Sequence, residues 1–171
     1  NHLVDWGASD PDFIFLNYHK SYTINDVLYQ VETLSKPLKY IPDDYIGIHI
    51  NSSIDTIFLY LACIKNNKTP ILIPTTISKS ELDYLINHYQ IKHIISEWAS
   101  KSLFDQGSVI YYLEELINSS RGCGVLPNSN LNSNPESILF TSGSTGHPKA
   151  VSLDLKNFYH SSLAWNKKIE F

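Results

Sequence analysis

The chain has few cysteines, no methionine and no long hydrophobic stretch. Cysteine occurs only at Cys63 and Cys123, and neither has closely spaced His or Cys partners, so a disulfide framework or a zinc site has little support. This usage favours a reducing, cytoplasmic location. The longest uninterrupted apolar run, Ile57–Ile64, is far shorter than the roughly 20 residues of a membrane-spanning helix. We therefore expect no membrane span, and the missing initiator methionine leads us to expect a fragment of a longer protein.

Positive charge is also in short supply. The chain carries 13 Lys and Arg against 17 Asp and Glu, a formal net charge of -4, and the charges are spread rather than blocked. Such a distribution gives no electrostatic footprint for a nucleic-acid partner. A phosphate ligand would instead need a local arrangement of donors. The hydrophobic content of 43% is sufficient for the core of one domain or a large subdomain.

Short apolar runs alternate with helical patterns along most of the chain. Helices are predicted by apolar residues at spacings of three and four, and Thr23 and the pair Ser78 and Glu81 have the types and spacing of helix caps. The predicted strands are Tyr45–Ile50, Pro70–Ile73, His93–Ser96, Val109–Tyr111, Ser137–Phe140 and Ala150–Leu153. The predicted helical faces are Ile24, Val27, Leu28, Val31 and Leu34; Ile54, Ile57, Phe58, Leu61 and Ala62; and Leu82, Leu85, Ile86 and Tyr89, followed by a short helix near Glu114–Ile117 and a last one over Leu155–Phe171.

This alternation predicts an α/β fold, a layered and largely parallel sheet flanked by helices on both faces. The segment Ser119–Glu136 is rich in Ser, Asn, Gly and Pro and is expected to be a surface loop. Cys63 falls in an apolar helix and is expected to be an inert core residue. The histidines show no metal-ligand spacing, so we assign no metal site and expect them at hydrogen-bonded core or surface positions.

The most informative segment follows the strand Ser137–Phe140. It supplies two glycines that allow a sharp turn and a close backbone approach, and four hydroxyl side chains and loop amides that can donate to oxyanions. Lys149 adds a positive charge at the far end. The candidate phosphate-binding residues are Thr141, Ser142, Gly143, Ser144, Thr145, Gly146 and Lys149.

This loop differs from the nucleoside-triphosphatase P-loop, which has four residues between its glycines followed at once by Lys and Ser or Thr. Here two residues separate the glycines, and Pro148 stands where the second glycine would be. Because the residues after Lys149 look like a strand, no helix dipole is expected to assist the loop. The same feature argues against a kinase, which would need a helix after the loop and an acidic magnesium ligand.

The run Thr141–Val151 resembles the phosphate-binding signature of the adenylate-forming superfamily, which contains acyl-CoA synthetases, peptide-synthetase adenylation domains and luciferases. The resemblance continues upstream in the family's order through Ser21–Val27, Gly47–Asn51, Ala62–Lys65, Ile73–Thr75 and Glu81–Leu82. Two positions depart from the family pattern, because Asn66-Asn67 replaces the usual Ala-Gly and Ala150 replaces the commoner glycine. Lys149–Val151 followed by Asn157–Tyr159 is similar to o-succinylbenzoate:CoA ligases of menaquinone biosynthesis.

This resemblance implies that residues 1–171 form an N-terminal subdomain, part of the large N-terminal domain of such a ligase, ending just after the phosphate-binding loop. It implies activation of a small carboxylate with ATP and Mg²⁺, followed by transfer to coenzyme A. The later motifs and the lysine of the carboxyl-terminal domain would come from the missing C-terminal part of the same chain, so the fragment alone is expected to be inactive. No catalytic residue is assigned within it. A peptide-synthetase adenylation domain and a non-catalytic interaction domain remain as alternatives.

Overall fold

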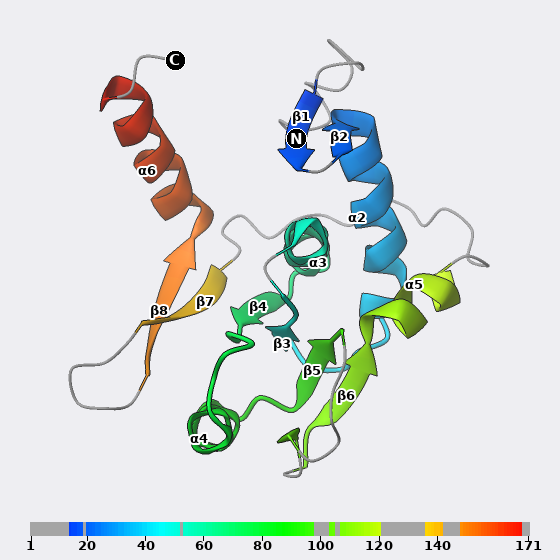
Figure 1. Cartoon of the computed structure of the whole chain (residues 1–171), viewed down its shortest axis with the longest axis vertical. Helices are drawn as coiled ribbons and strands as arrows, with labels where there is room; N and C mark the ends of the chain where they lie inside the picture. Colours follow the sequence, from blue (N-terminus) through cyan, green and yellow to red (C-terminus); the bar gives the residue numbers. More distant parts are fainter. Residues whose placement is uncertain are drawn as a thin grey trace.

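The structure is a computed structural model that describes residues 14–18, 20–51, 53–97, 103–104, 107–120, 136–141 and 148–168. Figure 1 shows a mixed sheet with helices around it and one helix projecting at the end of the chain. Its strands are β1 (Ile14–Tyr18), β2 (Lys20–Thr23), β3 (Tyr45–His49), β4 (Thr69–Leu72), β5 (His93–Ser96), β6 (Val109–Tyr112), β7 (Glu136–Thr141) and β8 (Lys149–Asp154). Its helices are α2 (Ile24–Leu38), α3 (Ile54–Lys65), α4 (Lys79–Tyr89), α5 (Leu113–Ser120) and α6 (Leu155–Lys168).

The main sheet has six strands in the order β6-β5-β3-β4-β7-β8. Strands β6, β5, β3, β4 and β7 run parallel to their neighbours, and β8 pairs antiparallel with β7 at one edge. A separate antiparallel pair, β1 and β2, leads into α2. The predicted largely parallel α/β sheet is therefore confirmed, whereas no sequence pattern indicated the β1–β2 pair.

Helices cover both faces of the sheet because its central strands are apolar on both sides. In β3, Ile46 and Ile48 face a core shared with α2, α3 and α5. In β5, Ile95 belongs to the same core, whereas its neighbour Ile94 faces a second core shared with α4. This division follows from the alternation of side chains along a strand. Figure 1 shows α4 on one side of the sheet and α2, α3 and α5 on the opposite side.

Gly47 lies between the two inward-facing isoleucines of β3 and allows close packing on the α4 side. A Cβ atom at this position would lie 3.0 Å from Cγ1 of Ile94 and 3.1 Å from Cδ1 of Ile73 and Cγ2 of Ile91. Those contacts are tighter than ordinary van der Waals distances, so the missing side chain lets three isoleucines meet over the strand.

The predicted helix caps form as the sequence indicated. The Thr23 hydroxyl accepts a hydrogen bond from the Asp26 amide at 3.2 Å, and the Ser78 amide donates to the Glu81 carboxylate at 3.1 Å. These bonds satisfy amides that have no partner in the first turn of a helix. At the end of α3, Asn67 has a positive φ of 57°. Asn67 thus takes the left-handed turn that often follows a helix, a conformation that asparagine tolerates.

The predicted inward face of α3 was wrong in part. Ile57 is 40% exposed, whereas Leu59 and Cys63 are fully buried. Helix α3 packs against both α2 and the sheet. Its buried face is therefore wider than the row of residues predicted from apolar spacing, and it is turned toward Leu59 and Cys63. The predicted loop also begins later than expected, since α5 extends to Ser120 and β7 already includes Glu136; residues 121–135 lie outside the described part of the chain.

Helix α6 continues from the end of β8 and projects from the edge of the sheet (Figure 1), and its described side chains from Leu155 to Trp165 are exposed. Its start is fixed by a reciprocal pair, in which the Asp154 carboxylate accepts from the Asn157 amide and the Asn157 side chain accepts from the Asp154 amide, both at 2.8 Å. The helix predicted over Leu155–Phe171 is confirmed through Lys168, and the last three residues lie outside the described structure.

Candidate functional site

The strand β7 and the strand β8 form a hairpin that carries the two ends of the predicted phosphate loop. Thr141 is the last residue of β7 and Lys149 the first of β8, and the two are paired across the ladder. The Thr141 hydroxyl donates to the Lys149 carbonyl oxygen at 3.4 Å. Both residues are exposed. The structure thus brings these two candidates together at the loop end of the hairpin, which we call the hairpin mouth. The other candidates, Ser142, Gly143, Ser144, Thr145 and Gly146, lie outside the described residues.

The hairpin mouth lies at the carboxyl edge of the parallel strands. Strand β7 runs parallel to β4, with Ile71 opposite Ile138 and Leu72 opposite Leu139. The residues that follow β4 and those that end β7 therefore meet at the same edge. In open α/β sheets this edge is where ligands bind. The position of Thr141 and Lys149 is consistent with that rule.

A shallow pocket of about 250 Å³ opens beside the hairpin mouth. One wall comes from the connection between β4 and α4, and the other from the two arms of the hairpin. The lining residues are Pro74, Thr76, Ile77, Glu81, Phe140, Thr141 and Pro148. Thr76, Ile77 and Pro148 were not among the candidate residues. Thr76 and Ile77 come shortly after the buried strand β4, which neighbours β7, and just after Ile73–Thr75, which carried part of the family resemblance. Pro148 directly precedes Lys149 in the predicted loop.

Two charged side chains at or beside the pocket, Glu81 and Lys149, differ in whether they can bind a ligand. The carboxylate of Glu81 accepts hydrogen bonds from the amide and the hydroxyl of Ser78, at 3.1 Å and 2.6 Å, so it is engaged in capping α4. Lys149 is exposed at the start of β8. A strand, β8, and not a helix follows the loop, as the sequence predicted.

A second polar cluster lies at the carboxyl ends of β3 and β5. Nδ1 of His49 lies 3.4 Å from the Ser96 hydroxyl, and its ring packs edge-on against Phe104 at 5.3 Å. Burial lowers the pKa of His49, while its own backbone and the charge of Glu97 oppose that shift. Nε2 is buried without a hydrogen-bond partner in the described structure. The expectation that the histidines are fully hydrogen-bonded is therefore wrong for His49.

Cys63 is fully buried, and burial raises the pKa of its thiol to about 12. A thiol with this pKa stays protonated near neutral pH and is a poor nucleophile. The expectation of an inert core cysteine is confirmed. Cys123 lies outside the described residues. Among the helices that the structure describes, none combines the length and the apolar character that crossing a membrane requires.

The model of the AMP-binding enzyme family matches residues 3–170. The chain therefore belongs to the AMP-binding enzyme family, which confirms the resemblance drawn from the loop.

Two curated relatives show how much of a longer protein is matched. The chain is 29% identical over 141 residues to one of the plipastatin synthase proteins of Bacillus subtilis, covering 75% of this chain and 5% of that protein. It is 26% identical over 177 residues to 2-succinylbenzoate--CoA ligase of Staphylococcus aureus, covering 89% of this chain and 36% of that enzyme. The chain thus spans only a minor part of the relatives that it matches.

Solved structures share the fold at low sequence identity. The o-succinylbenzoate CoA synthetase of Bacillus subtilis, solved with its acyl-adenylate intermediate, superposes with a TM-score of 0.85 at 17% identity, over 100% of this chain and 46% of that chain. The N-terminal subdomain of Klebsiella oxytoca NpsA superposes with a TM-score of 0.73 at 19% identity, over 89% of this chain and 39% of that chain. These likenesses establish the fold.

Proposed function

We propose that the protein containing this chain is an acid-thiol ligase that activates a carboxylate with Mg-ATP and then forms a thioester with coenzyme A. The observation that carries this proposal is the pairing of Thr141 with Lys149 at the carboxyl edge of the sheet, beside the pocket, in a chain of the AMP-binding family. Solved structures of the B. subtilis synthetase with ATP and magnesium and with a CoA product analogue support these cofactors. The sparse cysteines favour the cytoplasm as the location.

In the proposed reaction, a carboxylate oxygen of the substrate bonds to the α-phosphorus of ATP and the bond to the bridging oxygen breaks, releasing pyrophosphate. Lys149 and the hydroxyls of Ser142, Ser144 and Thr145 would donate to the β- and γ-phosphates. Negative charge grows on this leaving group as the bond breaks, so fixed donors stabilise the transition state. The exposed Lys149 beside an open pocket fits such a group. We assign no magnesium ligand, because the described residues hold no cluster of acidic or His side chains.

For the carboxylate, we propose o-succinylbenzoate, which would place the enzyme in menaquinone biosynthesis. Support comes from the similarity to the S. aureus ligase, which extends over 89% of this chain. An amino acid is the second candidate, because the chain is also 29% identical to a plipastatin synthase protein. Pyrophosphate exchange by the full-length protein should therefore require o-succinylbenzoate, and an amino acid should not support it.

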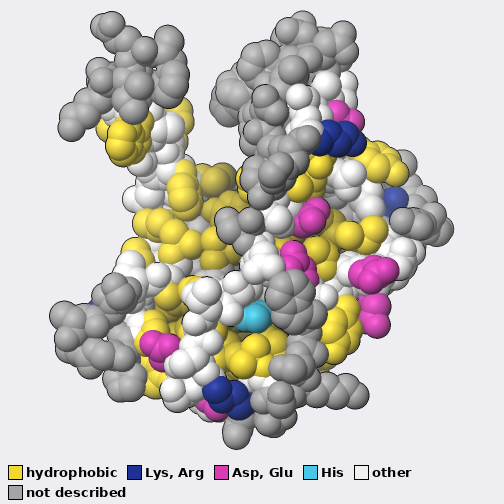
Figure 2. All heavy atoms as spheres, in the orientation of Figure 1, with side chains coloured by type: hydrophobic (Ala, Val, Ile, Leu, Met, Phe, Trp, Pro, Cys, Tyr) yellow, Lys and Arg dark blue, Asp and Glu magenta, His cyan; other side chains and the backbone are white. Residues whose placement is uncertain are grey.

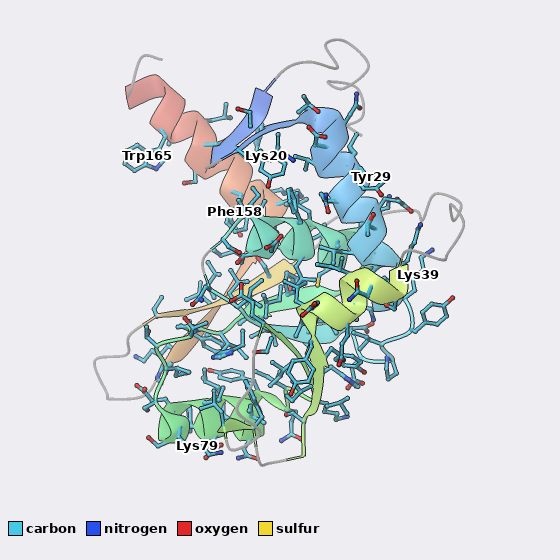
Figure 3. The ribbon with its side chains drawn as sticks, turned by 45° about the vertical axis from the view of Figure 1, so that its right-hand side comes forward. Lys20, Tyr29, Lys39, Lys79, Phe158 and Trp165 are labelled. Carbon is cyan, nitrogen blue, oxygen red and sulfur yellow. The ribbon has the colours of Figure 1, made fainter. Side chains whose placement is uncertain are left out.

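We also propose that further chain of the same protein covers the exposed apolar surface of β8 and α6. The exposed fractions are 37% for Val151, 44% for Leu155, 39% for Phe158, 61% for Tyr159, 39% for Leu163 and 61% for Trp165. Figure 2 shows hydrophobic side chains gathered at the base of the α6 projection, on the side facing α3. In Figure 3, Trp165 points away from the sheet. The match covers 46% of the B. subtilis synthetase, so the rest of that chain is longer than the matched part. A segment of that length could cover this surface and supply the adenine and ribose contacts.

The test of the proposed function is the substitution Lys149→Ala in the full-length protein. A charge-assisted hydrogen bond contributes about 1.5 to 3 kcal/mol, so pyrophosphate exchange should slow by about ten- to hundredfold. The matched control is Lys156→Ala, which removes another exposed lysine a short distance along the chain and should leave exchange unchanged. Equal rates for Lys149→Ala and the unsubstituted protein would overturn the assignment. Absence of exchange with every carboxylate would favour a non-catalytic interaction domain.

A further inference from the structure

Tyr89, the last residue of α4, contacts both arms of the hairpin at its mouth. Its hydroxyl accepts a hydrogen bond from the Ala150 amide at 3.3 Å. Its ring packs on Phe140, with centroids 5.4 Å apart and planes tilted by 54°. Phe140 immediately precedes Thr141, and Ala150 immediately follows Lys149. A single side chain from the end of α4 therefore contacts the residues next to both ends of the loop.

The position of Tyr89 is itself fixed by its neighbours. The ring of His88 meets it edge-on at 4.8 Å, and Tyr84 stacks on the other side of His88 at 5.1 Å. Directly after Tyr89, helix α4 stops at Gln90, whose φ is 54°. The Ile91 amide then donates back to the Ile86 carbonyl at 3.0 Å, and Ile91 is 1% exposed. The backbone on both sides of Tyr89 is thus anchored to the core through Ile86 and Ile91.

We propose that Tyr89 is a positioning residue for Thr141 and Lys149, the described ends of the phosphate loop, and that it acts through the Ala150 amide and the Phe140 ring. This inference rests on the proposed function, because it assigns Tyr89 to the same site. The hydrogen bond fixes where β8 begins and therefore where the Lys149 side chain starts. The ring contact fixes the end of β7 and therefore Thr141. Tyr89 does not itself touch the nucleotide.

Tyr60 provides a matched comparison at the opposite end of the same hairpin. Its hydroxyl donates to the Ser137 hydroxyl at 3.0 Å, and Ser137 in turn donates to the Leu153 carbonyl at 3.2 Å. Tyr60 comes from α3 and Tyr89 from α4, on opposite faces of the sheet. Replacing either tyrosine by phenylalanine removes one hydroxyl hydrogen bond and keeps the ring. The two substitutions differ in which end of the hairpin they loosen.

The first test measures amide hydrogen exchange at Ala150 in the full-length protein and needs no activity. Loss of a hydrogen bond that is worth roughly 0.5 to 1.5 kcal/mol should make the Ala150 amide exchange about two- to tenfold faster in Tyr89→Phe. Tyr60→Phe should leave that amide unchanged. Unchanged exchange at Ala150 in Tyr89→Phe, or equal acceleration in both variants, would overturn the proposal.

The second test uses pyrophosphate exchange by the full-length protein and separates positioning from mere packing. The loop is proposed to hold the leaving group in the transition state, so Tyr89→Phe should lower kcat by about two- to tenfold with the KM for the carboxylate unchanged. Tyr60→Phe should keep both constants. A kcat that is equal in the two variants contradicts the role of Tyr89. If the protein shows no exchange reaction, the proposed function fails, and the Ala150 measurement then decides only whether Tyr89 holds the start of β8.

Discussion

The centre of the sheet and its β7–β8 edge are held together in different ways. In the centre, Ile46, Ile94 and Ile95 are 0% exposed and pack between helices on both faces. At the edge, the hairpin is fastened by the hydroxyls of Tyr60 and Tyr89, and α6 beyond it keeps a largely exposed apolar surface. Apolar burial is the dominant favourable term in folding, so the centre supplies the stability of this unit. The β7–β8 edge carries the candidate phosphate-binding residues Thr141 and Lys149 next to this stable core.

The largest effect should come from removing apolar volume in the centre. Ile94→Ala leaves a cavity between β5 and α4 and should lower the free energy of unfolding by about 2 to 5 kcal/mol. Leu163→Ala removes a side chain of similar size from α6, where it is 39% exposed, and should change stability by about 0.5 kcal/mol or less. Denaturant titration of both variants measures the contrast. Similar losses would show that the edge contributes as much as the centre.

A smaller effect should come from adding volume to the centre. Gly47→Ala places a methyl group 3.1 Å from Cδ1 of Ile73 and 3.0 Å from Cγ1 of Ile94, and overpacking of this kind costs about 1 to 3 kcal/mol. Ile73→Val removes the Cδ1 atom and should recover part of that loss when it is combined with Gly47→Ala. A double-mutant cycle of unfolding free energies measures the coupling. Strict additivity would mean that the strain lies elsewhere.

The difference between the two regions also explains what the sequence could predict. The central strands have apolar residues on both faces, so β5 was predicted with its observed bounds His93–Ser96. The caps at Thr23 and Ser78 were also predicted, because they depend on residues only three positions apart in the sequence. The buried face of α3 was predicted only in part, because tertiary neighbours on two sides decide it. The contact of Tyr89 with Ala150 spans 61 positions, and no local pattern marks it.

The smallest predicted effect is a dependence of stability on pH that originates in the centre. Burial lowers the pKa of His49 in the folded protein, whereas in the unfolded chain it has the ordinary value of about 6.5. The unfolded chain therefore binds more protons at acidic pH, so stability is fully present above about pH 6.5 and falls as the pH drops toward the folded pKa. Unfolding free energies measured between about pH 8 and pH 5 should show this decline.

The substitution His49→Gln isolates this group, because glutamine fills a similar place and does not titrate. It should flatten the decline on the acidic side. The buried Nε2 without a partner is the structural cause, since a proton gained there would be a charge enclosed by the ring of Phe104 and the end of β5. Glu97 opposes the shift but does not reverse it. An unchanged slope in His49→Gln would show that a titrating group other than His49, outside the centre of the sheet, causes the loss of stability at acidic pH.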